Sequence, residues 1–147
     1  MDLHYILLNA HKGFAYLELA LVAAFLVLLL VTMFGYSGNI SKALRKVTLF
    51  TMIFFHVQFL VGIIMLLGTS SFLDTIKQIG MGGLMKNPSL RFTFIEHPFS
   101  MLIAAILMTI VNKKLKTADK LTIRLMSLGL VAIALFVFAF PWARVFG

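Results

Sequence analysis

Histidines inside long apolar stretches are the residues of this sequence best suited to chemistry. Three of the four histidines, His11, His56 and His97, lie in such stretches. An ionisable side chain is costly in hydrocarbon, so a membrane-embedded histidine is a candidate functional residue. Grouped together, the three favour a site that holds a metal ion or a haem.

The composition is that of an integral membrane protein. Of the 147 residues, 61% are hydrophobic and only 12% are charged, which no water-soluble domain of this size requires. The net charge of +8 does not indicate nucleic-acid binding, because the basic residues cluster at the ends of apolar runs. We expect one membrane domain over residues 1–147, in contact with the lipid bilayer.

Four stretches are long enough to cross a bilayer, which takes about 20 apolar residues. They cover residues 3–34, 41–68, 88–111 and 121–140, and Asp2 is a candidate N-cap for the first. The sequence therefore predicts an all-α, four-transmembrane-helix antiparallel bundle. Asn87 and Pro88 form a good helix start, which places Pro98 inside the third helix. We expect Pro98 to bend this helix and to leave the Phe94 carbonyl without its donor.

The connection over residues 69–87 predicts a short amphipathic helix on the outer surface, because its apolar residues follow helical spacing. Ser71 and Asp74 resemble a capping box at its start. Glycines then let the chain turn back into the membrane. The apolar positions are Phe72, Leu73, Ile76 and Ile79, and the glycines are Gly80, Gly82 and Gly83.

The distribution of basic residues predicts the orientation. The two loops at one end of the bundle carry about eight Lys and Arg, against about five at the other end. The positive-inside rule then places both termini on the non-cytoplasmic side of a bacterial inner membrane, as a multi-pass protein.

The rise of about 1.5 Å per residue gives each histidine a depth. His11, His97 and His56 lie about 13, 15 and 18 Å from the outer ends of their predicted helices. The three imidazoles could thus share one layer in the outer half of the bilayer. The preferred axial pair for a haem is His56 with either His11 or His97, and the sequence does not choose between the two.

A haem here would be held without covalent attachment, because the chain has no cysteine. Facing helices of a bundle can supply two imidazoles to one iron, and Gly62 leaves space beside them. Lys12, Arg91 and Arg144 are candidate partners for the propionates. The candidate aromatic walls are Phe54, Phe55, Phe59, Phe94 and Phe99.

Two acidic residues in apolar runs leave alternatives open. Glu96 neighbours His97, and Glu18 lies two helical turns after His11. The three histidines with Glu96 could bind zinc, copper or iron directly. The polar residues could also join helices in an accessory or assembly subunit, or form a proton or metal-ion pathway in a homo-oligomer.

Three segments carry a resemblance to a known family. They are residues 11–16 (HKGFAY), 55–62 (FHVQFLVG) and 95–101 (IEHPFSM). Together they resemble small bacterial four-span proteins described as cytochrome b-like, and the similarity extends over nearly the whole chain. The resemblance implies haem b bound through His11, His56 and His97 in some pairing.

The expected function is that of a b-type cytochrome that passes electrons between a quinone and a partner protein at the outer face. An electron carrier this small is expected to serve a larger membrane complex and not to act as an autonomous enzyme. The alternative is a non-haem accessory subunit or a His/Glu metal-binding membrane protein.

Overall fold

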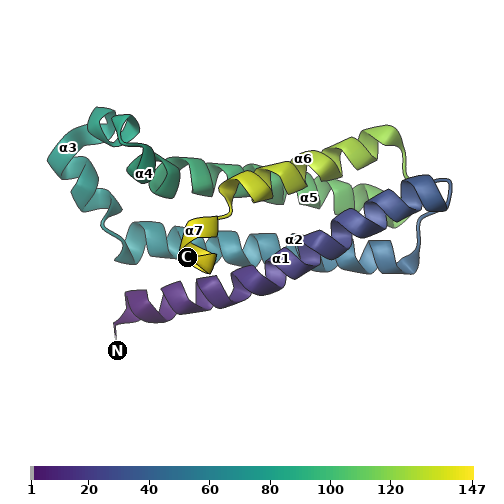
Figure 1. Ribbon diagram of the computed structural model, residues 1–147, viewed down its shortest axis with the longest axis horizontal. Helices are drawn as coiled ribbons and strands as arrows, with labels where there is room; N and C mark the ends of the chain where they lie inside the picture. The colour runs from purple at the N-terminus through teal and green to yellow at the C-terminus, as the bar shows by residue number, and fades with distance from the viewer. Residues whose placement is uncertain (1) are drawn as a thin grey trace.

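The protein is all-α, as predicted. The computed structural model describes residues 2–147, in which every regular element is a helix. Figure 1 shows α1, α2, α5 and α6 running side by side along the long axis, with α3 and α4 gathered at the end where the chain begins. In chain order the elements are α1 (Leu3–Gly35), α2 (Lys42–Ile64), η1 (Met65–Thr69), α3 (Phe72–Lys86), α4 (Pro88–Arg91), η2 (Phe92–Glu96), α5 (His97–Thr117), α6 (Ile123–Ala139) and α7 (Trp142–Phe146), where η denotes a π-helix.

Three continuous helical segments are long and apolar enough to cross a membrane. They are Leu3–Gly35, Lys42–Thr69 and Pro88–Thr117; the first two agree with their predicted spans to within one residue, and the third begins where predicted. The chain therefore has the helices of a membrane protein. The fourth predicted span forms α6, an apolar helix of 17 residues.

The predicted helix starts are confirmed by their capping hydrogen bonds. Asp2 accepts from the His4 amide at 3.2 Å. Asn87 Oδ1 accepts from the Ser89 and Leu90 amides, both at 3.1 Å. Because these side chains satisfy amides that have no partner inside the helix, they fix where α1 and α4 begin.

Pro98 lies inside a continuous helical segment, as expected, and the distortion takes the form of a π turn. The His97 amide bonds to the Phe92 carbonyl, five residues back. A proline has no amide hydrogen and its ring crowds the preceding turn, so the widened turn accommodates it without ending the helix. The segment then runs on to Thr117, six residues beyond the predicted end.

The connection between the second and third long helices folds as a helix, but two details of its prediction are wrong. Ser71 makes no side-chain capping bond. Instead, Ser70 Oγ accepts from the Phe72 amide at 3.2 Å. The helix also continues past the predicted turn, to Lys86, and only Gly80 leaves helical geometry, with φ +69°. Glycine adopts this left-handed backbone without strain, so a single residue supplies the break in α3.

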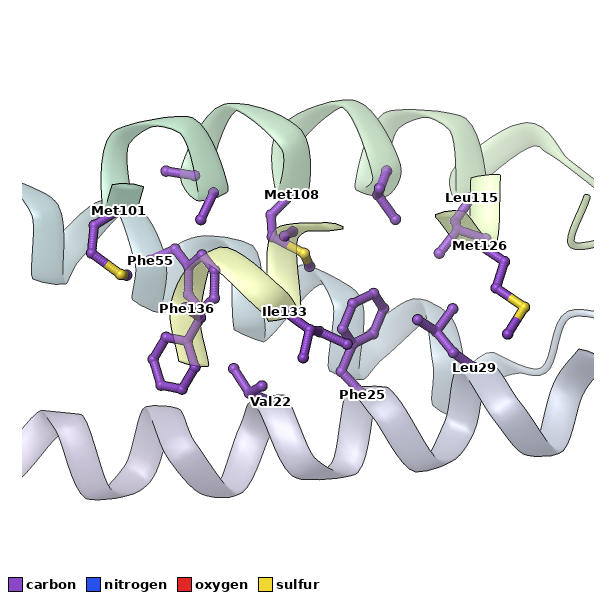
Figure 2. Packing of buried hydrophobic residues seen from close by; sticks show 14 of the residues in the cluster. Val22, Phe25, Leu29, Phe55, Met101, Met108, Leu115, Met126, Ile133 and Phe136 are labelled. Atoms are coloured by element: carbon purple, nitrogen blue, oxygen red, sulfur yellow. The ribbon is translucent and has the colours of Figure 1, made fainter. Parts of the chain in front are cut away.

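Small residues bring the helices of the core close together. Membrane helices associate through close packing, because lipid removes the hydrophobic advantage of burial. Ala104, Ala105 and Ala132 are almost fully buried. Figure 2 shows large side chains of α1 and α5 reaching into the space between the helices, together with those of α6. Phe55 and Phe136 stack there, with ring centres 5.5 Å apart.

Candidate cofactor site

A cavity of about 530 Å³ opens among α1, α2, η1, η2, α5, α6 and α7. It lies toward the end of the molecule that holds α3 and the N-terminus (Figure 1). Its volume falls in the range of about 300–1,000 Å³ that is usual for small-molecule and cofactor sites. The polar and charged side chains that line it are His4, His11, Lys12, Glu18, Gln58, Thr69, Ser70, Ser71, Thr93, His97 and Arg144.

One face of α1 contributes three ionisable residues to the cavity. His4, His11 and Glu18 are spaced seven residues apart, which is two helical turns, so all three lie on the same face. His4 lies near the start of the helix, where its Nδ1 shares a 2.8 Å hydrogen bond with Thr69 Oγ1. Glu18 is only 3% exposed. The cavity therefore extends from the helix end to a buried carboxyl group.

His11 and His97 face each other across the cavity. Their ring centres are 6.1 Å apart and the ring planes are nearly perpendicular, at 82°. His11 comes from α1 and His97 from the first turn of α5, directly after the π turn. Of the histidines proposed from sequence, these two are brought together.

The His97 imidazole is held by a backbone carbonyl. Its Nδ1 lies 2.7 Å from the Ala139 oxygen. A carbonyl only accepts, so Nδ1 carries the hydrogen and the neutral ring presents Nε2 with a free lone pair. Ala139 is the last residue of α6, where carbonyls have no donor within the helix. The end of α6 thus sets the tautomer of a histidine on α5.

Three buried polar atoms at the cavity lack a hydrogen-bond partner. They are His11 Nδ1, Glu18 Oε1 and Gln58 Oε1. Gln58 Nε2 donates to the His11 carbonyl at 2.9 Å, which joins α2 to α1 across the helix contact. Buried polar atoms are nearly always paired in proteins, and all three residues line the same cavity. The three residues form one buried polar cluster, in which the Gln58 side chain lies beside the side chains of His11 and Glu18.

His56 does not join this pair. Its side chain is exposed, and its Nδ1 donates to the Met52 carbonyl at 2.8 Å while its Nε2 lies 3.2 Å from Thr109 Oγ1. Thr109 is twelve residues beyond His97 on the same helix, a rise of about 18 Å. The expected layer of three imidazoles is therefore absent. Neither preferred axial pair, His56 with His11 or with His97, is formed.

The side chain of His56 points away because of its helical position. The buried face of α2 repeats at intervals of three and four residues, and His56 falls one residue outside it. The positions on this face are Leu44, Thr48, Thr51, Phe55 and Gln58. The depth of a residue along a helix does not determine which side of the helix it lies on. The spacing of the buried residues of α2 was the sequence signal that could have excluded His56 from the cavity.

The charged residues proposed from sequence divide into two groups. Arg91 and Glu96 bind each other, with Arg91 Nε 2.6 Å from Glu96 Oε1, and neither lines the cavity. Arg91 also donates to the Met85 carbonyl at 3.0 Å. Lys12 and Arg144 do line the cavity. Arg144 Nη2 donates to Thr93 Oγ1 at 2.7 Å, which ties α7 to the π turn before His97.

The aromatic walls differ in part from those expected. Phe59, Phe94 and Gly62 line the cavity, as predicted. Phe55 belongs to the core, Phe54 packs on Phe14, and Phe99 is 63% exposed. Sequence reasoning missed three phenylalanines of the cavity wall, two of them from α6 and the residue that follows it. They are Phe92, Phe136 and Phe140.

The His11 and His97 side chains are the donor set that the cavity brings together. Within residues 2–147, no group of three or more His, Asp or Glu side chains is placed to hold a metal, so the alternative of three histidines with Glu96 has no assembled site. Two opposed imidazoles in an aromatic cavity fit a planar group that provides the remaining ligands itself. Comparisons with protein-family models, curated proteins and solved structures find no match to this chain.

Proposed function

We propose that the protein is a membrane b-type cytochrome, with haem b held non-covalently between His11 and His97. The observation that carries this proposal is the 6.1 Å separation of the two ring centres within the cavity. Two imidazoles that ligate one metal ion from opposite sides, each at about 2 Å, have ring centres about 6 Å apart. The hydrogen bond from His97 to Ala139 adds the orientation usual for a ligating imidazole.

The rest of the cavity has the chemistry to hold a porphyrin. Phe59, Phe92 and Phe94 supply apolar walls that keep water from the iron. Lys12 and Arg144 provide cations for two propionates, and Arg144 is already oriented by Thr93. When bound, the haem supplies a one-electron carrier.

The membrane arrangement that fits this function has four spans. The α6 helix is about 25 Å long, slightly less than the hydrocarbon core of about 30 Å, and a thinner local bilayer or flanking residues would accommodate the difference. The larger basic clusters lie at the end of the bundle where α1 connects to α2 and α5 to α6. Except for Lys120 they belong to the helix ends and not to the loops: Lys42, Arg45 and Lys46 in α2, Lys113, Lys114 and Lys116 in α5, and Arg124 in α6. Both termini and the cavity then lie at the non-cytoplasmic side of a bacterial inner membrane.

A haem in the outer half of the bilayer suits electron transfer at the outer face. We propose that the electrons pass between a quinone in the bilayer and a redox partner protein, as part of a larger membrane complex. The chain is small, and a haem would occupy the cavity and leave no separate site for a substrate. We therefore propose an electron carrier and not an autonomous enzyme.

The test is the visible absorption spectrum of the full chain, purified in detergent after expression with ample haem. We expect a Soret band that shifts on reduction with dithionite, with sharp α and β bands from a low-spin iron with two histidine ligands. A colourless protein would overturn the proposal and favour an accessory or assembly subunit. A bound ion without a porphyrin spectrum would favour a metal-binding protein.

Gly62 offers a separate test of the position of the haem. A Cβ atom at Gly62 would lie 3.7 Å from His11 Cε1, an ordinary contact distance. We therefore expect Gly62→Ala to keep the pigment, whereas the larger side chain of Gly62→Leu projects beside His11 and lowers the haem content at least several-fold. The measurement is the ratio of Soret to protein absorbance. Equal haem content in both variants would place the haem elsewhere.

A further inference from the structure

The two histidines at the cavity are held unequally. The His97 ring is fixed by its hydrogen bond to the Ala139 carbonyl, at 2.7 Å. His11 Nδ1 is buried and has no partner. A carbonyl bonded to the far nitrogen of an imidazole both orients the ring and makes it a better ligand. Loss of such a partner typically weakens metal binding about 10- to 100-fold.

The surroundings of His11 leave its ring room to move. On the side of α2 its Cε1 atom faces Gly62, where even a Cβ atom would only reach contact distance, and the Gln58 side chain lies beside the ring. On the other side lies the cavity itself. The His97 ring has less freedom to rotate than the His11 ring, because the carbonyl of the last residue of α6, Ala139, holds its Nδ1. Pro98, the next residue in the chain, also restricts the backbone.

From this asymmetry we infer that His11 is an exchangeable ligand, and that the site binds a small diatomic ligand such as carbon monoxide in its place. The inference rests on the proposed haem. If haem is bound, one bond between a His11 nitrogen and the iron would break, and one bond between the iron and the carbon of carbon monoxide would form. No electron or proton is transferred. The protein would thereby sense or bind a diatomic gas in addition to carrying electrons.

The test is a titration of the dithionite-reduced, full-length protein with carbon monoxide, followed by absorption and stopped-flow spectroscopy. We expect the wild-type protein to form the adduct at a rate that becomes independent of carbon monoxide concentration, because release of His11 limits it. His11→Gly should bind carbon monoxide at least about 10-fold faster. Added imidazole should restore the wild-type spectrum and the slow rate. His56→Gly, which changes a histidine outside the cavity, should behave like the wild type.

The outcomes separate this inference from the proposed function. A reduced pigment that stays unchanged under saturating carbon monoxide overturns the exchange at His11 and leaves the haem proposal intact, and this result needs no variant. Equal rates in the wild type and in His11→Gly also overturn it. A colourless wild-type protein overturns both the inference and the haem.

Discussion

The His97→Ala variant is expected to lose the pigment, whereas His56→Ala is expected to keep it. His97 faces His11 at 6.1 Å and is oriented by Ala139, so its removal takes away the better-held ligand. Weakening a ligating histidine through its hydrogen-bond partner costs about 10- to 100-fold in affinity, and removing the ligand itself should cost at least the upper end of that range. The measurement is haem bound per protein, from the Soret absorbance of each purified variant.

His56→Ala is the matched control for this loss. Like His97, His56 bonds to a backbone carbonyl and lies in an apolar helix, but its ring contacts Met52 and Thr109 instead of the cavity. Circular dichroism and size-exclusion chromatography of both variants establish that each one folds. Loss of pigment from His56→Ala together with its retention in His97→Ala would favour the pairing through His56 that the sequence had suggested.

The helices could be predicted because their signals are local. Apolar runs give the three long segments, and the Asp2 and Asn87 caps mark two of the starts. The position of Pro98 inside the third segment could be predicted from the helix start at Asn87 and Pro88. The π turn that accommodates the proline could not be predicted, because a sequence indicates that a helix must be distorted but not which of its turns widens.

The site could be predicted only in part, because it depends on which helix faces meet. His11, His97 and Gly62 were found, since a histidine or glycine in an apolar run stands out. The role of the Ala139 carbonyl has no signature in the sequence, because every residue has a carbonyl. Only at the end of a helix does a carbonyl lack its partner within the helix and become available to a side chain such as His97. Arg91 and Glu96 were assigned to the cofactor and the metal, yet their attraction to each other satisfies both outside the cavity.

Gly129→Leu is expected to cause the largest loss of stability of any single glycine substitution in the bundle. A Cβ atom at Gly129 would lie 3.0 Å from Leu29 Cδ1 and 3.2 Å from Phe25 Cζ. Both neighbours are fully buried, in the core shown in Figure 2. A single Cβ meets only the tips of flexible side chains, so Gly129→Ala should be tolerated. The whole leucine side chain would push α6 away from α1, which we expect to cost about 3 kcal/mol or more.

Gly13→Leu is the matched control, because nothing lies within 4 Å of a Cβ atom built at Gly13. A glycine inside a helix is less favourable than most residues by up to about 1 kcal/mol, so this variant should be as stable as the wild type or slightly more stable. Thermal unfolding in detergent measures the stability of both variants.

Displacement of α6 also strains the 2.8 Å hydrogen bond from the Tyr16 hydroxyl to the Val145 carbonyl, which ties α1 to α7 beside the cavity. Gly129→Leu should therefore release haem faster than Gly13→Leu. Equal thermal stability of the two variants would contradict the close packing of α6 on α1 at Gly129.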